Sequence, residues 1–164
     1  MIKIFRLVAT TLFVCATTAQ AQESAASVAR ARNPSDVLRG TTGFNLSIET
    51  NAAVDTAAIR KNIEQTLQQA GIKTGPRETS QLQVLCVTLP DPKSPTIPWS
   101  CIVKVRQLIT RNVPSPMQFV GILWETSHKV SIAMRATFAA TLTGDIEGLV
   151  ADFADAWTTA NPKK

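Results

Sequence analysis

Two cysteines, Cys86 and Cys101, are spaced so that they could form a disulfide. Each lies in an alternating β-type run, over residues 82–89 and 101–106. A hairpin with the cysteines opposite each other sets apolar side chains against apolar ones across the strands, Val84 against Val103 and Leu82 against Val105. Redox-active pairs usually lie two residues apart near a helix N-terminus. The pattern therefore predicts a structural disulfide rather than a redox site.

His128 is the one histidine of the chain, and it follows Ser127. A Ser-His-Asp triad needs its three side chains to converge, whereas neighbours on a strand point to opposite faces. We therefore expect an exposed histidine at a strand end and a protein that is not an enzyme. A small hydrolase in which His128 pairs with another hydroxyl is the alternative.

No metal or cofactor site is expected. Asp152 and Asp155 are three residues apart on a predicted helix and could share a cation, but such pairs are usually a solvated face. One histidine without a free cysteine argues against zinc. Gly71 and Gly75 follow a helix, the reverse of a nucleotide-binding loop.

Trp99 is the candidate binding residue. It lies in a loop predicted over residues 90–100, which contains four prolines that stiffen it and prevent regular pairing. Trp99 either packs over the disulfide or serves as an aromatic anchor for a partner. This loop and the sheet edge at 44–50 are the expected contact surfaces.

Residues 1–21 have the pattern of a secretory signal peptide. Two basic residues precede an uncharged apolar run that ends at Ala19-Gln20-Ala21, so we expect cleavage after Ala21 and a periplasmic or secreted protein. The run is about a dozen residues, shorter than the about 20 of a membrane span, so no integral membrane segment is expected after cleavage. An uncleaved anchor and lipid attachment at Cys15 are the alternatives, and bulky Val14 disfavours the second.

The mature chain is predicted to have a flexible lead-in over 22–40 and a single α+β domain over 41–164. The whole chain has a net charge of +5, and loss of Lys3 and Arg6 with the leader lowers it to +3. The basic residues are scattered rather than clustered on one face, which argues against nucleic-acid binding.

The predicted element order is β-α-β-β-β-α. Alternation indicates strands near 44–49, 82–89, 101–110 and 118–126. Asp55 caps a helix that stops at Gly71, and a second helix runs from Phe138 to Asn161-Pro162. We expect a four-stranded, mainly antiparallel sheet with both helices on one face and one parallel pair; residues 130–132 either extend a strand or begin the last helix.

The C-terminal two-thirds resembles a loose group of small exported bacterial proteins of unknown function. The matching residues are Trp124-Glu125 on a strand, the acidic helix segment 152–157 and Asn161-Pro162-Lys163. The resemblance implies the α+β layout and brings no activity.

These patterns together suggest an exported, non-enzymatic module that binds another envelope protein or a small ligand. The alternatives are the hydrolase that uses His128 and a structural or assembly subunit.

Overall fold

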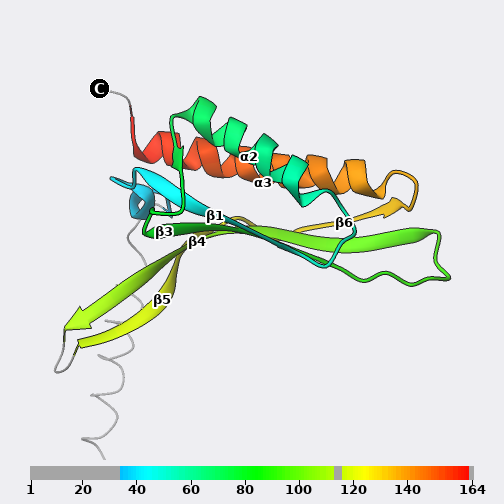
Figure 1. The fold of residues 1–164 in the computed structure, drawn as a ribbon, viewed down its shortest axis with the longest axis horizontal. Helices are drawn as coiled ribbons and strands as arrows, with labels where there is room; N and C mark the ends of the chain where they lie inside the picture. Colours follow the sequence, from blue (N-terminus) through cyan, green and yellow to red (C-terminus); the bar gives the residue numbers. More distant parts are fainter. Residues whose placement is uncertain (1–33, 113–115, 163–164) are drawn as a thin grey trace, which may run out of the picture. The chain divides into compact units, whose positions relative to one another are not determined.

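A mixed sheet with two α-helices on one face makes up the described part of this computed structural model, residues 34–112 and 116–162 (Figure 1). These residues belong to a unit that begins at Pro34. The predicted signal peptide, Cys15 and the first part of the predicted lead-in lie outside the described residues.

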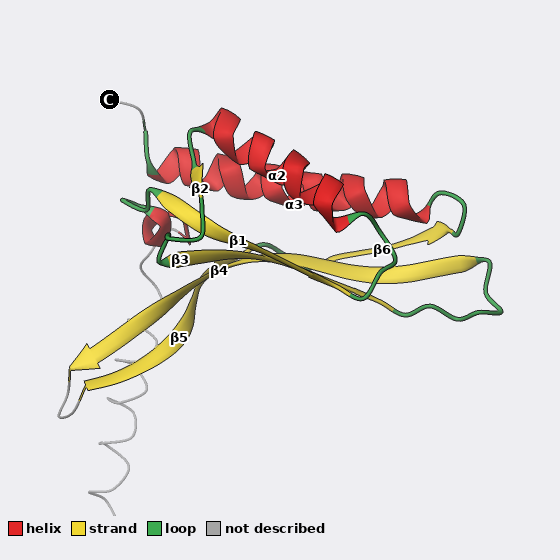
Figure 2. Cartoon of the chain, in the orientation of Figure 1, coloured by secondary structure: helices red, strands yellow, loops and turns green. Residues whose placement is uncertain are grey.

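The predicted α+β class with two helices is confirmed, but the strand count was wrong, because the sheet of the described residues has six strands rather than four (Figure 2). The prediction missed two short strands. One has only two residues, too few for a period, and the other has six, which also fit the start of a helix. The elements are η1 (Pro34–Leu38), β1 (Gly43–Thr50), α2 (Thr56–Ala70), β2 (Lys73–Thr74), β3 (Ser80–Thr88), β4 (Thr96–Asn112), β5 (Pro116–Glu125), β6 (Lys129–Met134) and α3 (Phe138–Ala160).

The strands are arranged in the order β2-β1-β3-β4-β5, and β6 also pairs with β4. β1 is parallel to β3, as predicted from the helix that joins them, and also to β2. β3, β5 and β6 are antiparallel to β4. One edge of β4 pairs with β3. Along its other edge, residues 96–101 of β4 pair with β6, and residues 104–112 pair with β5.

The predicted loop over 90–100 was too long, because β4 already begins at Thr96. Ile97 and Trp99 are buried, and residues 96–101 pair with β6. Pro98 lies inside the strand opposite Ile132, and its carbonyl accepts a hydrogen bond from the Leu89 amide at 3.1 Å. A proline lacks only the donor, so the prolines did not exclude pairing here.

Helix α2 forms for the local reasons that its sequence indicates. The Asp55 carboxylate accepts hydrogen bonds from the Ala57 and Ala58 amides at 3.0 Å, which satisfies two of the free amides of the first turn. Gly71 ends the helix with φ of 86°, a conformation that favours glycine. The apolar stripe is buried at Ile59, Ile63 and Leu67.

The core lies between the sheet and the helices. Alternate residues of β3 and β4 point to this side and are almost fully buried, so the disulfide lies within the core. Those residues are Leu82, Val84 and Cys86 on β3 and Trp99, Cys101, Val103 and Val105 on β4. Helix α3 covers them with its own buried stripe, which includes Leu142, Ile146, Val150 and Phe153.

The end of α3 is tied to the segment before β1. The Asn161 side chain accepts a hydrogen bond from the Gly40 amide at 2.7 Å and donates to the Leu38 carbonyl at 3.0 Å. The Trp157 indole donates to the Thr41 carbonyl at 3.1 Å. These bonds hold η1, with fully buried Leu38, against the helix.

Asn161→Ala should therefore lower the free energy of unfolding by about 1–3 kcal/mol, because two backbone groups lose their partner. Urea denaturation measures this loss. Thr159→Ala is the matched control: Thr159 is exposed and its hydroxyl bonds only the Asp155 carbonyl of its own helix. Equal stability of the two variants would contradict this role for Asn161.

Candidate interaction surface

Cys86 and Cys101 form the predicted disulfide, in the predicted register, with Val84 opposite Val103 and Leu82 opposite Val105. The two cysteines are 1% and 0% exposed. Thiol exchange requires access to a sulfur atom, so the burial supports a structural bridge.

Trp99 lies in the core rather than on the surface. It is 2% exposed, its indole packs edge-on against Phe138 with centroids 5.3 Å apart, and its Nε1 donates to Asp145 Oδ2 at 3.1 Å. A ligand would reach this ring only if α3 moved away from the sheet. The binding role of Trp99 therefore stays a prediction, and the surface lies elsewhere.

His128 is exposed in the segment between β5 and β6. Its Nδ1 lies 3.3 Å from Ser100 Oγ, so its hydroxyl neighbour is Ser100 rather than Ser127. Among the hydrogen bonds and ion pairs of the described residues, none joins His128 to a carboxylate. A serine nucleophile needs its histidine oriented by a third group, which this pair lacks.

Asp152 and Asp155 are both exposed on α3, the position expected for a solvated helix face. Residues 34–112 and 116–162 contain no group of three or more His, Cys, Asp or Glu side chains that could hold a metal. No helix in this part of the chain is long and apolar enough to cross a membrane.

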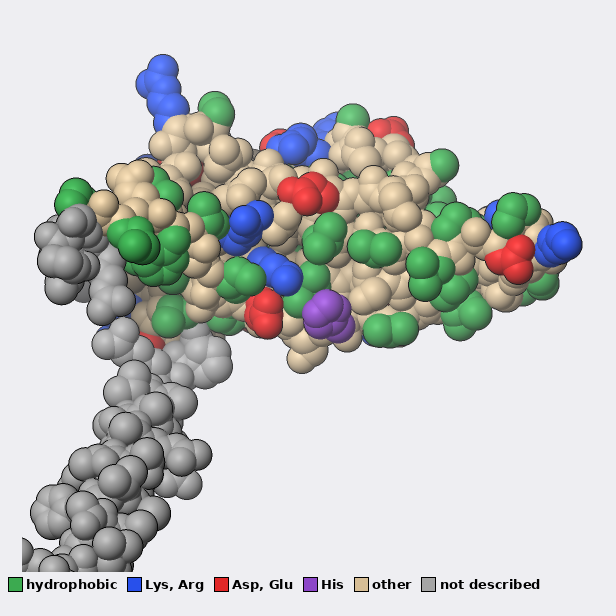
Figure 3. Space-filling view, turned by 90° about the horizontal axis from the view of Figure 1, so that it is seen from below, with side chains coloured by type: hydrophobic (Ala, Val, Ile, Leu, Met, Phe, Trp, Pro, Cys, Tyr) green, Lys and Arg blue, Asp and Glu red, His purple; other side chains and the backbone are tan. Residues whose placement is uncertain are grey.

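Among residues 34–112 and 116–162, no helix or strand covers the sheet face opposite the helices, and this face carries large apolar side chains (Figures 1 and 3). Val87 follows Cys86 on β3, and Val130, Ile132 and Met134 alternate along β6 with residues that face α3. We call the group the apolar face; its members, with their exposed fractions, are Val87 (46%), Leu89 (72%), Val130 (74%), Ile132 (63%) and Met134 (55%).

The register of the strands places the members of the apolar face on either side of β4. Ser100 of β4 lies between Val87 and Val130, and Pro98 lies opposite Ile132. In Figure 3 hydrophobic side chains gather toward the end on the right of the view. Arg135, just after β6, holds the β3–β4 loop by donating to the Ser94 and Asp91 carbonyls.

A polar belt crosses the same side of the sheet next to the apolar face. Glu49 Oε1 accepts from Gln83 Nε2 at 2.7 Å, and Arg106 donates to Gln83 Oε1 at 3.4 Å. Lys104 and Glu125 form an ion pair at 3.7 Å. The charged side chains of the belt therefore each have a hydrogen-bond or ion-pair partner within it. The belt lies between the apolar face and the hairpin formed by the ends of β4 and β5.

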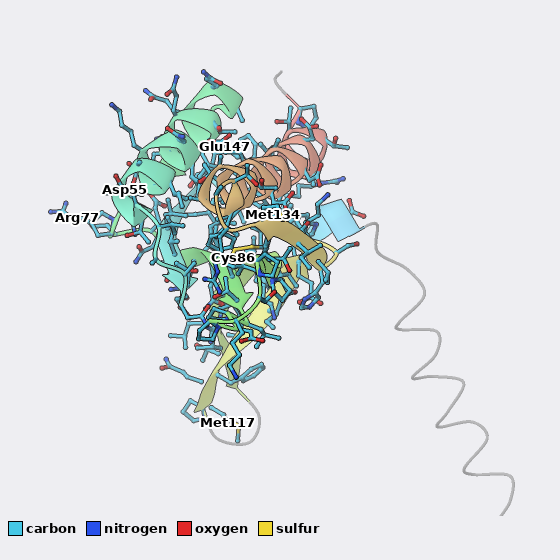
Figure 4. The ribbon with its side chains drawn as sticks, turned by 90° about the vertical axis from the view of Figure 1, so that its right-hand side faces the viewer. Asp55, Arg77, Cys86, Met117, Met134 and Glu147 are labelled. Atoms are coloured by element: carbon cyan, nitrogen blue, oxygen red, sulfur yellow. A yellow bond between two sulfur atoms is a disulfide. The ribbon has the colours of Figure 1, made fainter. Side chains whose placement is uncertain are left out.

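Beyond the belt, β4 and β5 continue as a hairpin that projects past the helices, with Met117 near its end (Figures 2 and 4). We call residues 106–112 and 116–122 the arm. Exposed apolar side chains cover it: Leu108, Met117, Phe119, Val120 and Ile122. A shallow depression of about 400 Å³ at its base is lined by four consecutive residues, 122–125.

Sequence reasoning missed both surfaces. The alternation Val130-Ser131-Ile132-Ala133-Met134 was the signal for β6, because large and small side chains follow period two. Alternation cannot tell which face of a strand is covered, so the apolar side of β6 would have been assigned to the core. The edge at 44–50 is partly used: the Phe44 carbonyl accepts from Gly75, and Arg60 donates to the Leu46 carbonyl.

The residues that carried the resemblance have structural roles. Trp124 packs on Phe153 with ring centroids 5.2 Å apart, and Asn161 ties the end of α3 to η1. Lys163 lies outside the described residues.

Comparison with known proteins finds no matching family model and no matching curated protein. Among solved structures, rare lipoprotein B from Shewanella oneidensis is 10% identical, with 71% of this chain and 92% of that chain covered and a TM-score of 0.28. A minor lipoprotein from Acinetobacter baumannii is also 10% identical, with 73% and 93% covered and a TM-score of 0.26. Likenesses this weak show no family, so the chain's own surfaces are the basis for its function.

Proposed function

We propose that this protein is an exported, non-enzymatic module that binds another protein of the cell envelope through the apolar face. One observation carries the proposal: five large apolar side chains, each 46–74% exposed, lie together on the side of the sheet opposite the helices. Grouped exposure of this kind marks interaction sites, whereas single exposed apolar residues need no explanation. Covering each side chain contributes on the order of 1 kcal/mol.

A protein partner fits this surface better than a small ligand does. Small molecules are held in concave sites that bury most of their surface. The apolar face is the outer side of a sheet, and the depression of about 400 Å³ at the base of the arm is lined by residues of β5 alone. An extended, open surface favours a partner that is itself extended.

Export is supported by the leader pattern over residues 1–21 and by the disulfide, which persists in oxidising compartments. The periplasm or the exterior is therefore the proposed location. The compartment is tested by N-terminal sequencing of the protein recovered from each cell fraction; a chain that retains Met1 in the cytoplasm contradicts export.

The hydrolase alternative draws on the Ser100–His128 pair, the one arrangement among the described residues with the residue types of a nucleophile and a base. Both groups lie on the surface, and the carboxylate of Asp145 is instead engaged with Trp99 and with Lys129 at 3.9 Å. An oriented base and a water-excluded site are what such catalysis requires. The non-enzymatic proposal therefore accounts better for His128.

Binding through the apolar face predicts a specific cross-linking pattern in the native envelope. A photo-crosslinking amino acid at position 130 should give an adduct of defined mass, and the same amino acid at Gln65, exposed on α2, should not. Ile132→Asp should reduce the adduct yield at least tenfold, because a carboxylate would be buried in an apolar contact.

The matched control is Gln65→Asp, which adds the same charge on the helix side and should leave the adduct at position 130 unchanged. Equal labelling from positions 130 and 65, or an adduct insensitive to Ile132→Asp, would contradict the proposal. Thermal unfolding of each variant is the folding control: a variant with the wild-type Tm has lost binding rather than folding.

A further inference from the structure

The sheet protects two of its exposed strands but leaves part of β5 unprotected. Exposed edges offer free amides and carbonyls, and natural proteins block them with short strands, charges or prolines. β2 has two residues, and β6 begins at Lys129 and is followed by Arg135. β5 has ten residues with no charge from Pro116 to Trp124, and among the described strands it pairs only with β4.

The unprotected part of β5 is bounded at both ends. Pro116 begins the strand, and an irregularity in the pairing near Val105 and Arg106 leaves Leu123 without a partner on β4. Residues 117–122 between these points are regular. Val120 and Ile122 point to the side of the apolar face, and Phe119 and Gly121 to the side of the helices, as their partners on β4 require.

From this edge we infer that two copies of the chain pair antiparallel through β5, about a twofold axis at Val120. A twofold contact sets a segment against itself, so a charge near the axis would meet its own copy. Residues 118–122, which are centred on this axis, carry no charge, and Val120 then lies opposite Val120 and Phe119 opposite Gly121. An aromatic ring across from a strand glycine is a favourable pair, because it covers backbone that glycine leaves bare.

The space around Gly121 is consistent with this contact. A Cβ added at Gly121 would overlap with Ile109 Cδ1, so the Ile109 side chain extends over the glycine. The ring of Phe119, 45% exposed, would then pack on Ile109 of the second copy's arm. The glycine thereby lets an apolar layer form on the helix side of the arm.

Within the unit that begins at Pro34, the position of the arm allows the second copy to approach. The arm projects past α2 and α3, with Met117 near its end (Figures 2 and 4). Two arms can therefore lie side by side while the helices of the two copies stay apart. A twofold axis perpendicular to the sheet keeps both apolar faces on the same side, so the dimer would present two binding surfaces to one partner and gain avidity.

Sedimentation velocity of the purified mature chain, over a range of concentrations, tests this inference. The wild-type chain should sediment as a concentration-dependent dimer. Val120→Lys sets two ammonium groups opposite each other at the axis, where like charges destabilise a strand pair, and should weaken the dimer at least tenfold.

Leu108→Lys is the matched control. Leu108 is the direct partner of Val120 on β4, has nearly the same exposure at 54% against 55%, and lies one strand away from the axis. This variant should remain dimeric. A wild-type chain that is monomeric throughout, or a Val120→Lys dimer as tight as wild type, would overturn the inference.

A mixing experiment distinguishes a loss of dimerisation from a loss of folding. Val120→Lys and Val120→Asp should each be monomeric alone and should form a heterodimer when mixed, because the axis then sets opposite charges together. Circular dichroism shows whether each variant is folded. If both are folded and the mixture still does not associate, the proposed pairing of Val120 with Val120 is contradicted. Ile132→Asp should leave the dimer intact, so this result is independent of the test of the apolar face.

Discussion

Phe153→Ala should lower the free energy of unfolding by about 3–5 kcal/mol, the usual cost of removing a buried aromatic ring. Phe153 is 0% exposed and lies at the centre of an aromatic group. Its ring packs edge-on against Phe44 and against Trp124, each with centroids 5.2 Å apart. The three residues come from α3, β1 and β5, so the lost ring would loosen the helix from two strands at once.

Equilibrium unfolding in urea measures this loss, and Phe119→Ala is its matched control. Phe119 loses the same atoms on the exposed arm, where we expect a change of less than about 1 kcal/mol in the monomer. If Phe153→Ala does not fold, Phe153→Leu keeps most of the volume and should cost less than about 2 kcal/mol. Comparable losses at positions 153 and 119 would contradict the packing described for Phe153.

Removing the disulfide should have the second-largest effect. The bond joins residues 15 apart in sequence, and a closed loop of this length stabilises a protein by about 3 kcal/mol through the entropy of the unfolded chain. Cys86→Ala with Cys101→Ala should lower the unfolding free energy by about this amount. Val84 and Val103 would still hold the two strands in register, so the fold should persist.

A reductant separates the bond from the packing of the sulfur atoms. Wild-type protein that is reduced with dithiothreitol while unfolded should have about the stability of the double variant, and the reductant should leave the variant itself unchanged. Because both cysteines are almost fully buried, reduction of the native wild type should be slow and should require unfolding first. A double variant as stable as the oxidised protein would show that the loop entropy is offset elsewhere.

The parts of the fold that were predictable depend on local signals. Helix α2 has its cap at Asp55, its stop at Gly71 and its stripe between them, all within one short segment. The β3–β4 register could be predicted from the cysteine positions, since this alignment sets apolar residues opposite each other. Each of these inferences needed residues that are neighbours in sequence or lie on one hairpin.

The parts that failed depend on contacts between distant segments. Trp99 is buried because Phe138 and Asp145 of α3 lie over it, and nothing near Trp99 in the sequence indicates that helix. The β6 strand exists because it pairs with residues 96–101, most of which have the sequence pattern of a loop. The apolar face was missed for the same reason: its members come from the C-terminal end of β3 with the residue after it and from β6, which β4 brings together.

The position of the disulfide also determines how the protein would respond to a cut in its chain. Cys86 and Cys101 lie on opposite sides of the exposed connection between β3 and β4. A protease that cleaves this connection would divide the polypeptide in two, yet the fragments would remain covalently joined beside the break. The fragment with β1, α2 and β3 would stay joined to the fragment with the arm and α3 until the bond itself is reduced.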